Sequence, residues 1–540
     1  MKRTASHVKF WGRGLGRLCA VVAAEEALAM RRQLLLALRQ TPTVELRLDW
    51  LKNDRQRTMF LNWLGKGRSR NRRFSRATLI ATCRRIEGGG RLHGDAQAEL
   101  SWLAAARAAG CQWCDLEIET VRRLPGKSLR AAQDGALPPA ILLSLHDFVK
   151  TPAKLPDLST TLRTTPQPQD SPAAIKIAAH AKRLADGLRL LRYARRAENI
   201  VAVPMGEVGL PLRILALRAG SALAYAPIAE ATAPGQVSLR DMKELYRAHL
   251  LNRASKIYGV IGDPIAHSLS PLMHNTGYIA RGLNAVFLPF LVHALPDFLA
   301  AIGDVGLRGF SVTLPHKQSI LRHLKTCDPL AADIGAVNTV LVKPDSSLHG
   351  YNTDYLGVLR ALEPHMKLRD SRVLIFGAGG SGRAAAFALA RAGAHVAICA
   401  RRPAAARELA KACGGESIPQ RALRTETFDA ILNATPVGMH PNTSISPLDS
   451  RELHCRVVMD LIYRPLRTKL LQIAAQQGIA AISGVEMFVA QGAAQWELFT
   501  RTPAPEKQMR AVVLRALQAA EVFRAQGGSS PSAKNARGRV

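Results

Sequence analysis

Short apolar runs recur along the first 250 residues, and stretches rich in Ala, Leu and Arg with a helical period separate most of them. Eight of these runs have the length and composition of buried strands. They are CAVVA, TVELRLDW, ATLIATC, CDLEIE, AILLSLHD, AAIKIA, NIVAVPM and SALAYAP. Strands that alternate with helices in this way predict a parallel (β/α)8 barrel.

Charged and apolar residues alternate within two of these strands. In TVELRLDW, Glu45, Arg47 and Asp49 share one face. CDLEIE repeats the pattern with Asp115, Glu117 and Glu119. Because the apolar side chains of a barrel strand pack against the outer helices, the charged faces are expected to point into the barrel.

Three single residues stand out in this half. Lys176 lies mid-strand between two isoleucines, where an unpaired ammonium is costly. Burial and cationic neighbours such as Arg47 are expected to lower its pKa, giving a neutral amine that can attack a ketone. His146 ends a strand, where barrels place catalytic groups. Arg213 can bind a carboxylate bidentately.

Residues 373–402 predict a dinucleotide-binding unit. Val373–Phe376 form an apolar strand, a Gly-x-Gly-x-x-Gly loop follows, and a helix and a second strand complete the pattern. In this context the glycines allow a sharp turn into a helix whose first amides receive a pyrophosphate. The predicted loop consists of Gly377, Ala378, Gly379, Gly380, Ser381 and Gly382.

The end of the second strand indicates which cofactor binds. NAD sites usually carry an acidic residue there, but this chain has Ala400, Arg401 and Arg402. Two guanidinium groups suit a 2′-phosphate. NADP(H) is therefore the predicted cofactor, and solvated surface arginines are the alternative.

Polar residues also follow several strands of the second half. Strand ends that open toward one crevice are ligand sites in open α/β sheets. These residues are Thr313, Lys317, Asn338 and Asp354. Ser270 before Pro271 is expected to be a helix N-cap. Met487 and Gln491 lie one turn apart on a predicted helix.

Composition restricts the remaining possibilities. A chain of 540 residues with 47% hydrophobic residues can form two to four domains. Eight scattered cysteines indicate a reducing compartment, the cytoplasm. Cys111 and Cys114 form a single Cys-x-x-Cys without a second pair, so no metal is expected. No apolar run has the length of a membrane span.

The net charge of +33 requires its own explanation. Basic residues crowd Lys66–Arg76 and both tails, and such runs can bind nucleic acid. No aromatic stacking pattern accompanies them, so a solvated basic loop is favoured. The last fourteen residues are expected to be disordered.

Residues Leu18 to Leu250 resemble type I 3-dehydroquinate dehydratase through ELRLD, SLHDF, IKIA, the run into Arg213 and TAPGQVS. The resemblance implies that Lys176 forms a Schiff base with the substrate ketone and that His146 moves protons. It implies a substrate-binding set of Glu45, Arg47, Arg84, Arg213, Thr232 and Gln236. Strict spacing places Gly88 at the family's acidic position, and whether Glu87 fills that role stays open.

Residues Lys256 to about Arg524 resemble shikimate dehydrogenase. The resemblance implies that Lys317 and Asp354 are the catalytic pair. It implies a substrate-binding set of Ser268, Ser270, Thr313, Asn338, Tyr463 and Gln491, and a nicotinamide-facing set of Leu461, Gly484 and Met487. Ser311 stands where many relatives have Asn.

The hypothesis is a fused enzyme that makes 3-dehydroshikimate and reduces it to shikimate with NADPH. The expected domains are a basic tail (1–17), the barrel (18–250), a substrate subdomain (256–356), an NADP-binding subdomain (357–484), returning helices (485–524) and a disordered tail (525–540). The alternatives are a degenerate barrel, an NAD-dependent quinate dehydrogenase, and a nucleic-acid-binding protein on an enzyme scaffold. Small-molecule substrates are the expected partners, without a membrane; nucleic acid is disfavoured.

Overall fold

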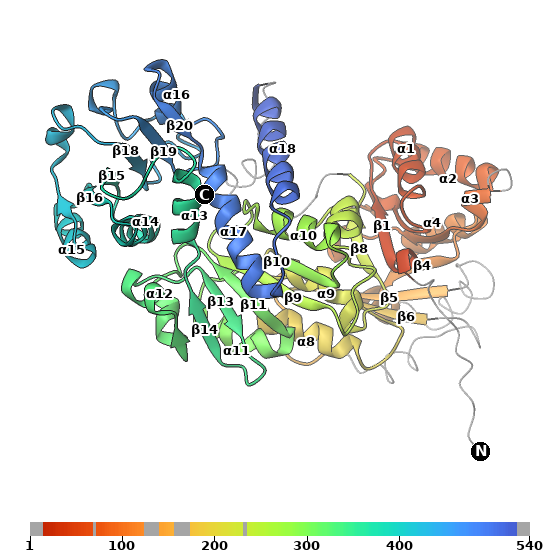
Figure 1. Ribbon diagram of the computed structural model, residues 1–540. Coiled ribbons are helices and arrows are strands. Elements are labelled where there is room, and N and C mark those ends of the chain that lie inside the picture. The colour runs from red at the N-terminus through yellow and green to blue at the C-terminus, as the bar shows by residue number, and fades with distance from the viewer. Residues whose placement is uncertain (1–13, 69–71, 124–139, 156–172, 230–234, 526–540) are drawn as a thin grey trace. The chain divides into compact units, whose positions relative to one another are not determined.

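The computed structural model describes residues 14–68, 72–123, 140–155, 173–229 and 235–525. Its contacts divide the chain into two compact units (Figure 1). The first comprises Met1–Ser255 and Pro296–Val305, and the second comprises Lys256–Leu295 and Gly306–Val540. The finer domain boundaries stay predictions, and most of both basic tails lies outside the described residues.

Eight parallel strands in the described part of the first unit form a nearly closed barrel. They are β1 (Leu18–Val22), β2 (Thr43–Arg47), β3 (Thr78–Thr82), β4 (Trp113–Glu117), β5 (Ala140–Asp147), β6 (Ala173–His180), β7 (Ile200–Met205) and β8 (Ala224–Pro227). The ladder runs β7-β6-β5-β4-β3-β2-β1-β8. The amide of Ala222 donates to the carbonyl of Ile200 at 2.7 Å, which joins the segment before β8 to β7. The predicted barrel is confirmed.

Helices connect the strands of the barrel. They are α1 (Ala27–Ala37), α2 (Asp54–Arg68), α3 (Arg72–Ser75), α4 (Ala96–Ala108), α5 (Ile118–Arg123), α8 (Leu184–Ala194) and α9 (Leu210–Ala219). Inside the barrel, alternate residues of the strands form an apolar layer that includes Ile80, Trp113, Leu142 and Val201. Lys176 is on the same face of β6 as Ala174 and Ala178 of that layer, because strand side chains alternate.

Three expectations about local structure in the first unit are wrong. β2 ends at Arg47, and Asp49 lies in the short helix η2 (Leu48–Trp50). β4 ends at Glu117, so Glu119 falls in α5 and is exposed instead of facing the barrel interior. In the basic segment 66–76, the described residues are largely helical, because α2 continues to Arg68 and α3 spans Arg72–Ser75.

The second unit contains two six-stranded sheets. The first has the order β10-β9-β11-β13-β14-β12 and combines parallel and antiparallel pairs. Its strands are β9 (Lys256–Gly262), β10 (Ala285–Leu291), β11 (Leu307–Val312), β12 (Thr326–Cys327), β13 (Thr339–Val342) and β14 (Leu348–Tyr351). The helices in this segment are α10 (Ser270–Ala280) and α12 (Pro329–Ile334), whereas α11 (Leu295–Val305) belongs to the first unit except for Leu295.

The second sheet is parallel throughout, with the order β17-β16-β15-β18-β19-β20. Its strands are β15 (Arg372–Phe376), β16 (His395–Cys399), β17 (Glu416–Ser417), β18 (Ala430–Asn433), β19 (Val457–Asp460) and β20 (Ala480–Ile482). Its helices are α14 (Gly380–Arg391), α15 (Pro403–Cys413) and α16 (Lys469–Gln476). Strand, glycine loop, helix and strand follow one another as the sequence predicts.

Three long helices connect the two sheets of this unit. They are α13 (Asp354–Leu362), α17 (Gly484–Thr500) and α18 (Glu506–Ala525). α17 packs through Val485 and Val489 against Met273 of α10 and Met509 of α18. It passes so close to α13 that a Cβ at Gly357 would lie 2.8 Å from the carbonyl oxygen of Met487.

The cap predicted at Ser270 is wrong. The N-cap of α10 is Leu269, and Ser270 is the first helical residue. The oxygen of Ser268 accepts a hydrogen bond from the amide of Ser270 at 3.3 Å. The side chain that binds the helix start is therefore two residues earlier than predicted.

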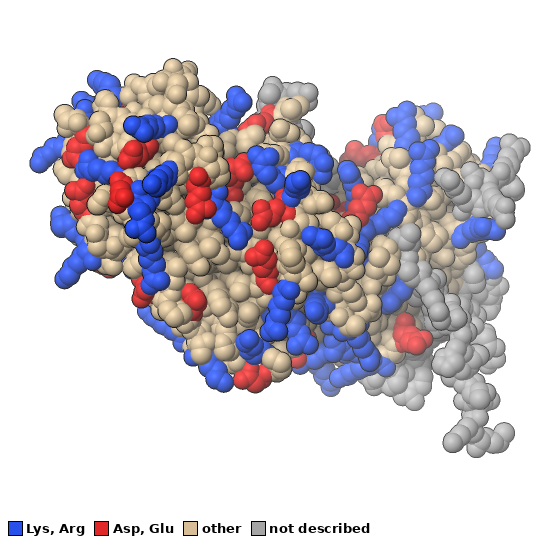
Figure 2. Space-filling model, viewed as in Figure 1, with Lys and Arg blue, Asp and Glu red and all other residues tan. Residues whose placement is uncertain are grey.

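Charge, cysteines and hydropathy complete the description. Lys and Arg side chains are scattered among acidic and uncharged residues on the face shown in Figure 2. All eight cysteines are free, and Cys111 and Cys114 are buried. In the part of the chain that the structure describes, no helix is both long and apolar enough to cross a membrane.

Candidate active sites

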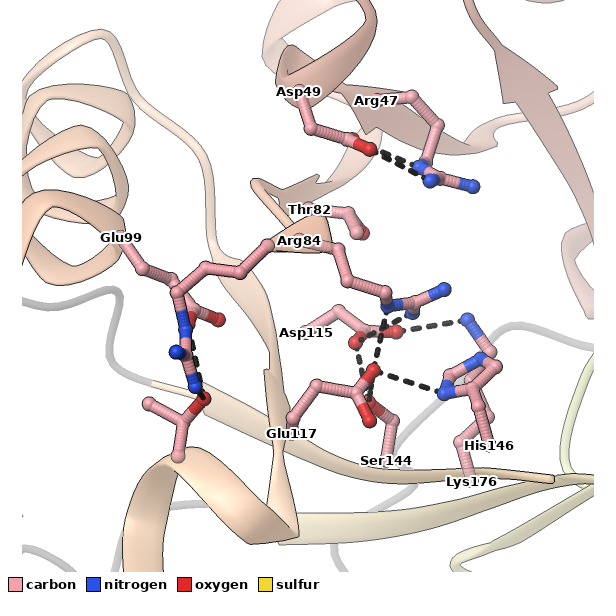
Figure 3. Close-up of polar contacts among 12 residues, drawn as sticks. Arg47, Asp49, Thr82, Arg84, Glu99, Asp115, Glu117, Ser144, His146 and Lys176 are labelled. Atoms are coloured by element: carbon pink, nitrogen blue, oxygen red, sulfur yellow. Dashed lines mark hydrogen bonds and ion pairs between the residues drawn. The ribbon is translucent and has the colours of Figure 1, made fainter. Parts of the chain in front are cut away.

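Lys176 lies between two carboxylates inside the barrel, and Figure 3 shows its contact with one of them, Asp115. Its Nζ is 2.8 Å from Oδ2 of Asp115 on β4 and 3.1 Å from Oε1 of Glu45 on β2. All three side chains are buried. The amine is thus an ammonium with two buried counter-ions, which resolves the cost of placing it between isoleucines.

The expectation of a lowered Lys176 pKa is wrong for this arrangement. Burial favours the neutral amine, but Asp115 and Glu45 together outweigh it, so the pKa of Lys176 lies above its ordinary value. The cation that opposes them is Arg84. Arg47 instead forms two bonds to Asp49, of 2.9 and 2.7 Å. The amine becomes neutral only when its proton passes to another group, and the two carboxylates are in reach.

Arg84 connects these carboxylates to a third one. Its Nη2 is 3.2 Å from Oδ1 of Asp115, and its Nε is 2.5 Å from Oε1 of Glu117. The hydroxyl of Ser144 donates to Asp115 at 2.6 Å or to Glu117 at 3.0 Å. Positive neighbours hold the pKa of Asp115 below its usual range despite burial, because Lys176 and then Arg84 outweigh the desolvation.

His146 completes the cluster from the end of β5. Its Nδ1 lies 2.9 Å from Oε1 of Glu117 (Figure 3). Burial, followed by the charge of Arg84, lowers the pKa of His146, although Glu117 opposes this shift. A neutral imidazole with a proton on Nδ1 toward Glu117 leaves Nε2 free to accept a proton. His146 can therefore act as a base at neutral pH.

The other residues predicted for the barrel site lie elsewhere or have other partners. Nε of Arg213 donates to the carbonyl of Pro204 at 2.6 Å, and burial lowers the pKa of Arg213 to about 10. Gln236 is half-buried outside any helix or strand, and Thr232 lies outside the described residues. Glu87 is exposed and pairs with Arg85 and Arg123, so it is not part of the Lys176 cluster.

Asp115 and Glu117 are functional residues that the site prediction omitted. Charged and apolar residues alternate in CDLEIE, and this alternation, which places both carboxylates on the inward face, could have identified them. Ser144 had no such signal, because it lies in an apolar run. Strand register brings it into the site: Ser144 is level with Lys176 on one side and with Glu117 on the other.

The second unit has a Lys–Asp pair. Nζ of Lys317 donates to Oδ2 of Asp354 at 2.6 Å. Oδ1 of Asp354 accepts from Nδ2 of Asn338 at 2.7 Å. Lys317 follows β11, and Asp354 follows β14 as the first residue of α13, so the segments after two strands of one sheet form the pair. Both side chains are largely buried, which fixes the ammonium on one oxygen of the carboxylate.

Polar side chains around this pair form a connected network. Nδ2 of Asn338 also approaches Oε1 of Gln491 at 3.5 Å. Ser311 donates to Gln495 at 2.7 Å, and Gln495 donates to the carbonyl of Asn338 at 3.2 Å. Asn338, Asp354 and Gln491 are thus together as predicted.

The remaining predicted substrate residues sit at nearby element ends. Thr313 follows β11, and its amide donates to the carbonyl of Ile261 at 3.0 Å. Ser268 and Ser270 lie at the start of α10. The ring of Tyr463 stacks on Phe488 of α17, with centroids 4.6 Å apart. No hydrogen bond between described residues joins these four to Lys317.

The glycine loop leads from β15 into α14. Gly377 has φ +120°, a conformation that L side chains rarely adopt, and a Cβ at Gly382 would lie 2.1 Å from the carbonyl oxygen of Gly377. A Cβ at Gly379 would meet nothing within 4 Å. Two glycines therefore permit the turn, and Gly379 leaves open space at the start of α14, where a phosphate binds in such loops.

The loop also lies near the Lys–Asp pair. A Cβ at Gly380 would be 3.7 Å from Cδ of Lys317. Met487 is buried on α17, and a Cβ at Gly484 would lie 2.6 Å from the carbonyl oxygen of Leu461, so these three predicted residues lie on adjoining segments. Arg401 and Arg402 are exposed at the start of α15. The residues present therefore fit a phosphorylated dinucleotide.

These arrangements define an enzyme with two centres, one around a barrel lysine and one at a dinucleotide-binding crevice. Comparisons with known families agree. Residues 18–252 match the model for type I 3-dehydroquinase, residues 260–340 the shikimate dehydrogenase substrate binding domain, and residues 484–514 the shikimate 5′-dehydrogenase C-terminal domain.

Individual relatives cover either most of the chain or about half of it. A chloroplastic bifunctional 3-dehydroquinate dehydratase/shikimate dehydrogenase of Arabidopsis thaliana is 34% identical over 86% of this chain and 78% of that protein. A shikimate dehydrogenase (NADP(+)) of Methanosarcina acetivorans is 40% identical over 49% of this chain and 99% of its own length. A Thermus thermophilus shikimate 5-dehydrogenase solved with NADP(H) and shikimate is 36% identical over 48% of this chain and all of that one, with TM-score 0.46. The chain belongs to the family of bifunctional 3-dehydroquinate dehydratase/shikimate dehydrogenases.

Proposed function

We propose that the first unit dehydrates 3-dehydroquinate to 3-dehydroshikimate and that the second reduces this product to shikimate with NADPH. The observation that carries the proposal is the buried Lys176, bonded to Asp115 and Glu45 and accompanied by a His146 that Glu117 holds. A degenerate barrel would have no reason to retain so costly a set of buried charges.

In the dehydratase, Lys176 passes a proton to a neighbouring carboxylate and attacks the ketone carbon. Loss of water gives a cationic imine, which withdraws electrons from the adjacent carbon. His146 removes a proton from that carbon through its free Nε2 and later returns a proton to the departing hydroxyl oxygen. Arg84 contacts two carboxylates of the cluster through Nη2 and Nε, and the N–H donors of its Nη1 can bind the substrate.

In the reductase, NADPH supplies the hydride. Lys317 donates the proton to the ketone oxygen, and Asp354 holds the ammonium in place at 2.6 Å. Asn338 and Gln491 hold substrate hydroxyls beside this pair, with Ser268, Ser270, Thr313 and Tyr463 around the carboxylate and ring. The loop Gly377–Gly382 holds the pyrophosphate, Arg401 and Arg402 hold the 2′-phosphate, and Leu461, Gly484 and Met487 face the nicotinamide.

One assay tests the whole proposal. The purified chain is given 3-dehydroquinate and NADPH, and the loss of NADPH absorbance is followed. Turnover requires both centres, because neither alone consumes NADPH from 3-dehydroquinate. If NADPH were consumed from added 3-dehydroshikimate but not from 3-dehydroquinate, the dehydratase would be absent.

The compartment and the partners belong to the same proposal. We place the chain in the cytoplasm, because all eight cysteines are free thiols, which suits a reducing compartment. The Arabidopsis relative is chloroplastic. The partners are the three small anionic substrates, without nucleic acid. Fractionation of cells followed by assay of 3-dehydroquinate-dependent NADPH oxidation tests the location.

A further inference from the structure

Tyr225 of β8 is a half-buried aromatic residue that the dehydratase mechanism has not used. Its strand pairs with β1 and places Tyr225 level with Cys19 of the apolar layer inside the barrel. The ring packs against this layer, and Nζ of Lys176 lies 4.2 Å from the ring centroid. An ammonium at this distance from an aromatic ring makes a cation–π contact.

The hydroxyl of Tyr225 is buried and has no hydrogen-bond partner among the described residues. Buried polar groups without a partner are uncommon and usually have a reason. Burial, the Cys19 thiol, and then the charges of Glu45 and Asp115 all raise the pKa of Tyr225. The hydroxyl is therefore a protonated donor that feels the charges of the two carboxylates that bind Lys176.

Counting hydrogens on the Lys176 nitrogen shows when such a donor is needed. An ammonium has three N–H donors, and two of them bind Glu45 and Asp115. When the ammonium condenses with a ketone, two hydrogens leave with the ketone oxygen as water. The cationic imine keeps the charge and a single N–H. At least one of the two carboxylates then loses a donor in a buried site, which is costly.

We propose that Tyr225 acts on the Lys176 nitrogen in two ways, by holding it as a cation over its ring and by donating its hydroxyl to the carboxylate that the imine releases. The proposal rests on the imine proposed above. It makes Tyr225 a catalytic residue of the dehydratase, since its ring contacts the reacting nitrogen. No hydrogen bond is lost to create the new one, because the hydroxyl has no earlier partner among the described residues.

Two substitutions separate the two roles. Tyr225→Phe keeps the ring and removes the hydroxyl, whereas Tyr225→Leu removes both. Each full-length variant is mixed with 3-dehydroquinate and borohydride over a range of pH, and the mass fixed at Lys176 is measured. Tyr246→Phe is the matched control, because Tyr246 is a buried tyrosine at the end of η4 (Asp241–Leu245) in the same unit.

For Tyr225→Phe we expect about tenfold less imine trapped at a subsaturating substrate concentration, with an unchanged melting temperature. For Tyr225→Leu we expect in addition that the pH at which Lys176 becomes reactive falls by about one unit, since the ring no longer stabilises the ammonium. Tyr246→Phe should trap imine as the unaltered chain does.

Other results would overturn the proposal. If Tyr225→Phe trapped as much imine as the unaltered chain, the hydroxyl would not replace the N–H donor that Lys176 loses. An unmoved pH profile in Tyr225→Leu would show that the ring does not act on the cation. Failure of the unaltered chain to fix mass at Lys176 would instead overturn the imine itself, which separates this test from the test of the proposed function.

Discussion

Glu117 and His146 form a buried pair inside the barrel, with Oε1 of Glu117 2.9 Å from Nδ1 of His146. The same oxygen is 2.5 Å from Nε of Arg84. Glu117 raises the pKa of His146, while burial and Arg84 lower it further than Glu117 can restore. The pair therefore sets both the orientation of the imidazole and the pH at which it works as a base.

Glu117→Gln should move the acid limb of the dehydratase pH–rate profile to lower pH, because the neutral amide no longer favours the imidazolium. The maximal rate should fall at least tenfold as the tautomer and orientation are lost. Measurement of 3-dehydroshikimate formation against pH checks both effects. Glu87→Gln is the matched control, and this exposed position should leave the rate within about twofold. If the acid limb moved to higher pH, Glu117 would not be the group that favours the imidazolium form of His146.

Lys176→Ala should destabilise the barrel as well as stop dehydration. The change leaves Asp115 and Glu45 buried with one cation fewer, and breaking such a pair costs about 3–5 kcal/mol. Urea unfolding at neutral pH, followed by circular dichroism, measures the loss. The variant should still reduce added 3-dehydroshikimate, because the dehydrogenase centre lies in the other unit. Unchanged stability would show that the lysine is not held by these carboxylates.

The pH dependence of barrel stability follows from the same residues. The folded-state pKa values of Asp115 and Glu45 are lowered, since Lys176 outweighs the effect of burial. Their stabilisation is fully present above the unfolded carboxyl pKa of about 4 and is lost as the pH falls below it. Without Lys176 both folded-state pKa values should rise, so the free energy of unfolding of Lys176→Ala should fall less between pH 7 and acid pH than that of the unaltered chain. An equal or steeper fall would contradict this account.

Lys317→Ala should reduce turnover of 3-dehydroshikimate by at least a hundredfold with little effect on NADPH affinity. The reason is that Lys317 contacts Asp354, whereas the cofactor phosphates are proposed to bind the glycine loop and the two arginines. Fluorescence titration with NADPH and steady-state assays separate the two quantities. An equal fall in affinity and turnover would make Lys317 a cofactor-binding residue.

Substitution of both Arg401 and Arg402 by Ala should remove most of the preference for NADPH over NADH. Each charge-assisted bond to the 2′-phosphate contributes about 1.5–3 kcal/mol. The ratio of kcat/KM for the two cofactors measures the preference. Arg407→Ala, one turn further along α15, is the control for a general loss of positive charge. Equal use of both cofactors by the unaltered chain would refute the NADP assignment.

The sequence predicted the elements better than the contacts between them. Eight barrel strands and the glycine loop follow from alternation and spacing, which are local properties. The partners of Lys176 are not local: Asp115 and Lys176 lie on β4 and β6, on either side of β5, and are 61 residues apart. Strand register places Asp115 level with Leu142 and Lys176 level with Ser144, one inward position further along, so only the folded barrel shows that the two side chains meet.

The errors have the same origin. Lys176 was expected to have a lowered pKa because its chain neighbours are apolar, but residues on other strands decide its charge. Arg47 was expected near Lys176, yet it bonds to Asp49, two positions along the chain. Ser270 was expected to cap α10, whereas the backbone enters the helix one residue earlier, at Leu269. In each case several neighbouring groups could interact, and only the folded backbone determines which of them do.

The contact between α13 and α17 at Gly357 has a consequence for how the dehydrogenase can flex. With no room for even a methyl group between the helices, α13 and α17 must tilt together as one body. Asp354 on one helix and Met487 and Gln491 on the other are therefore carried as a fixed unit through any opening of the crevice. We expect opening and closing of the crevice to change access for substrate and product while the distances among these three groups stay the same.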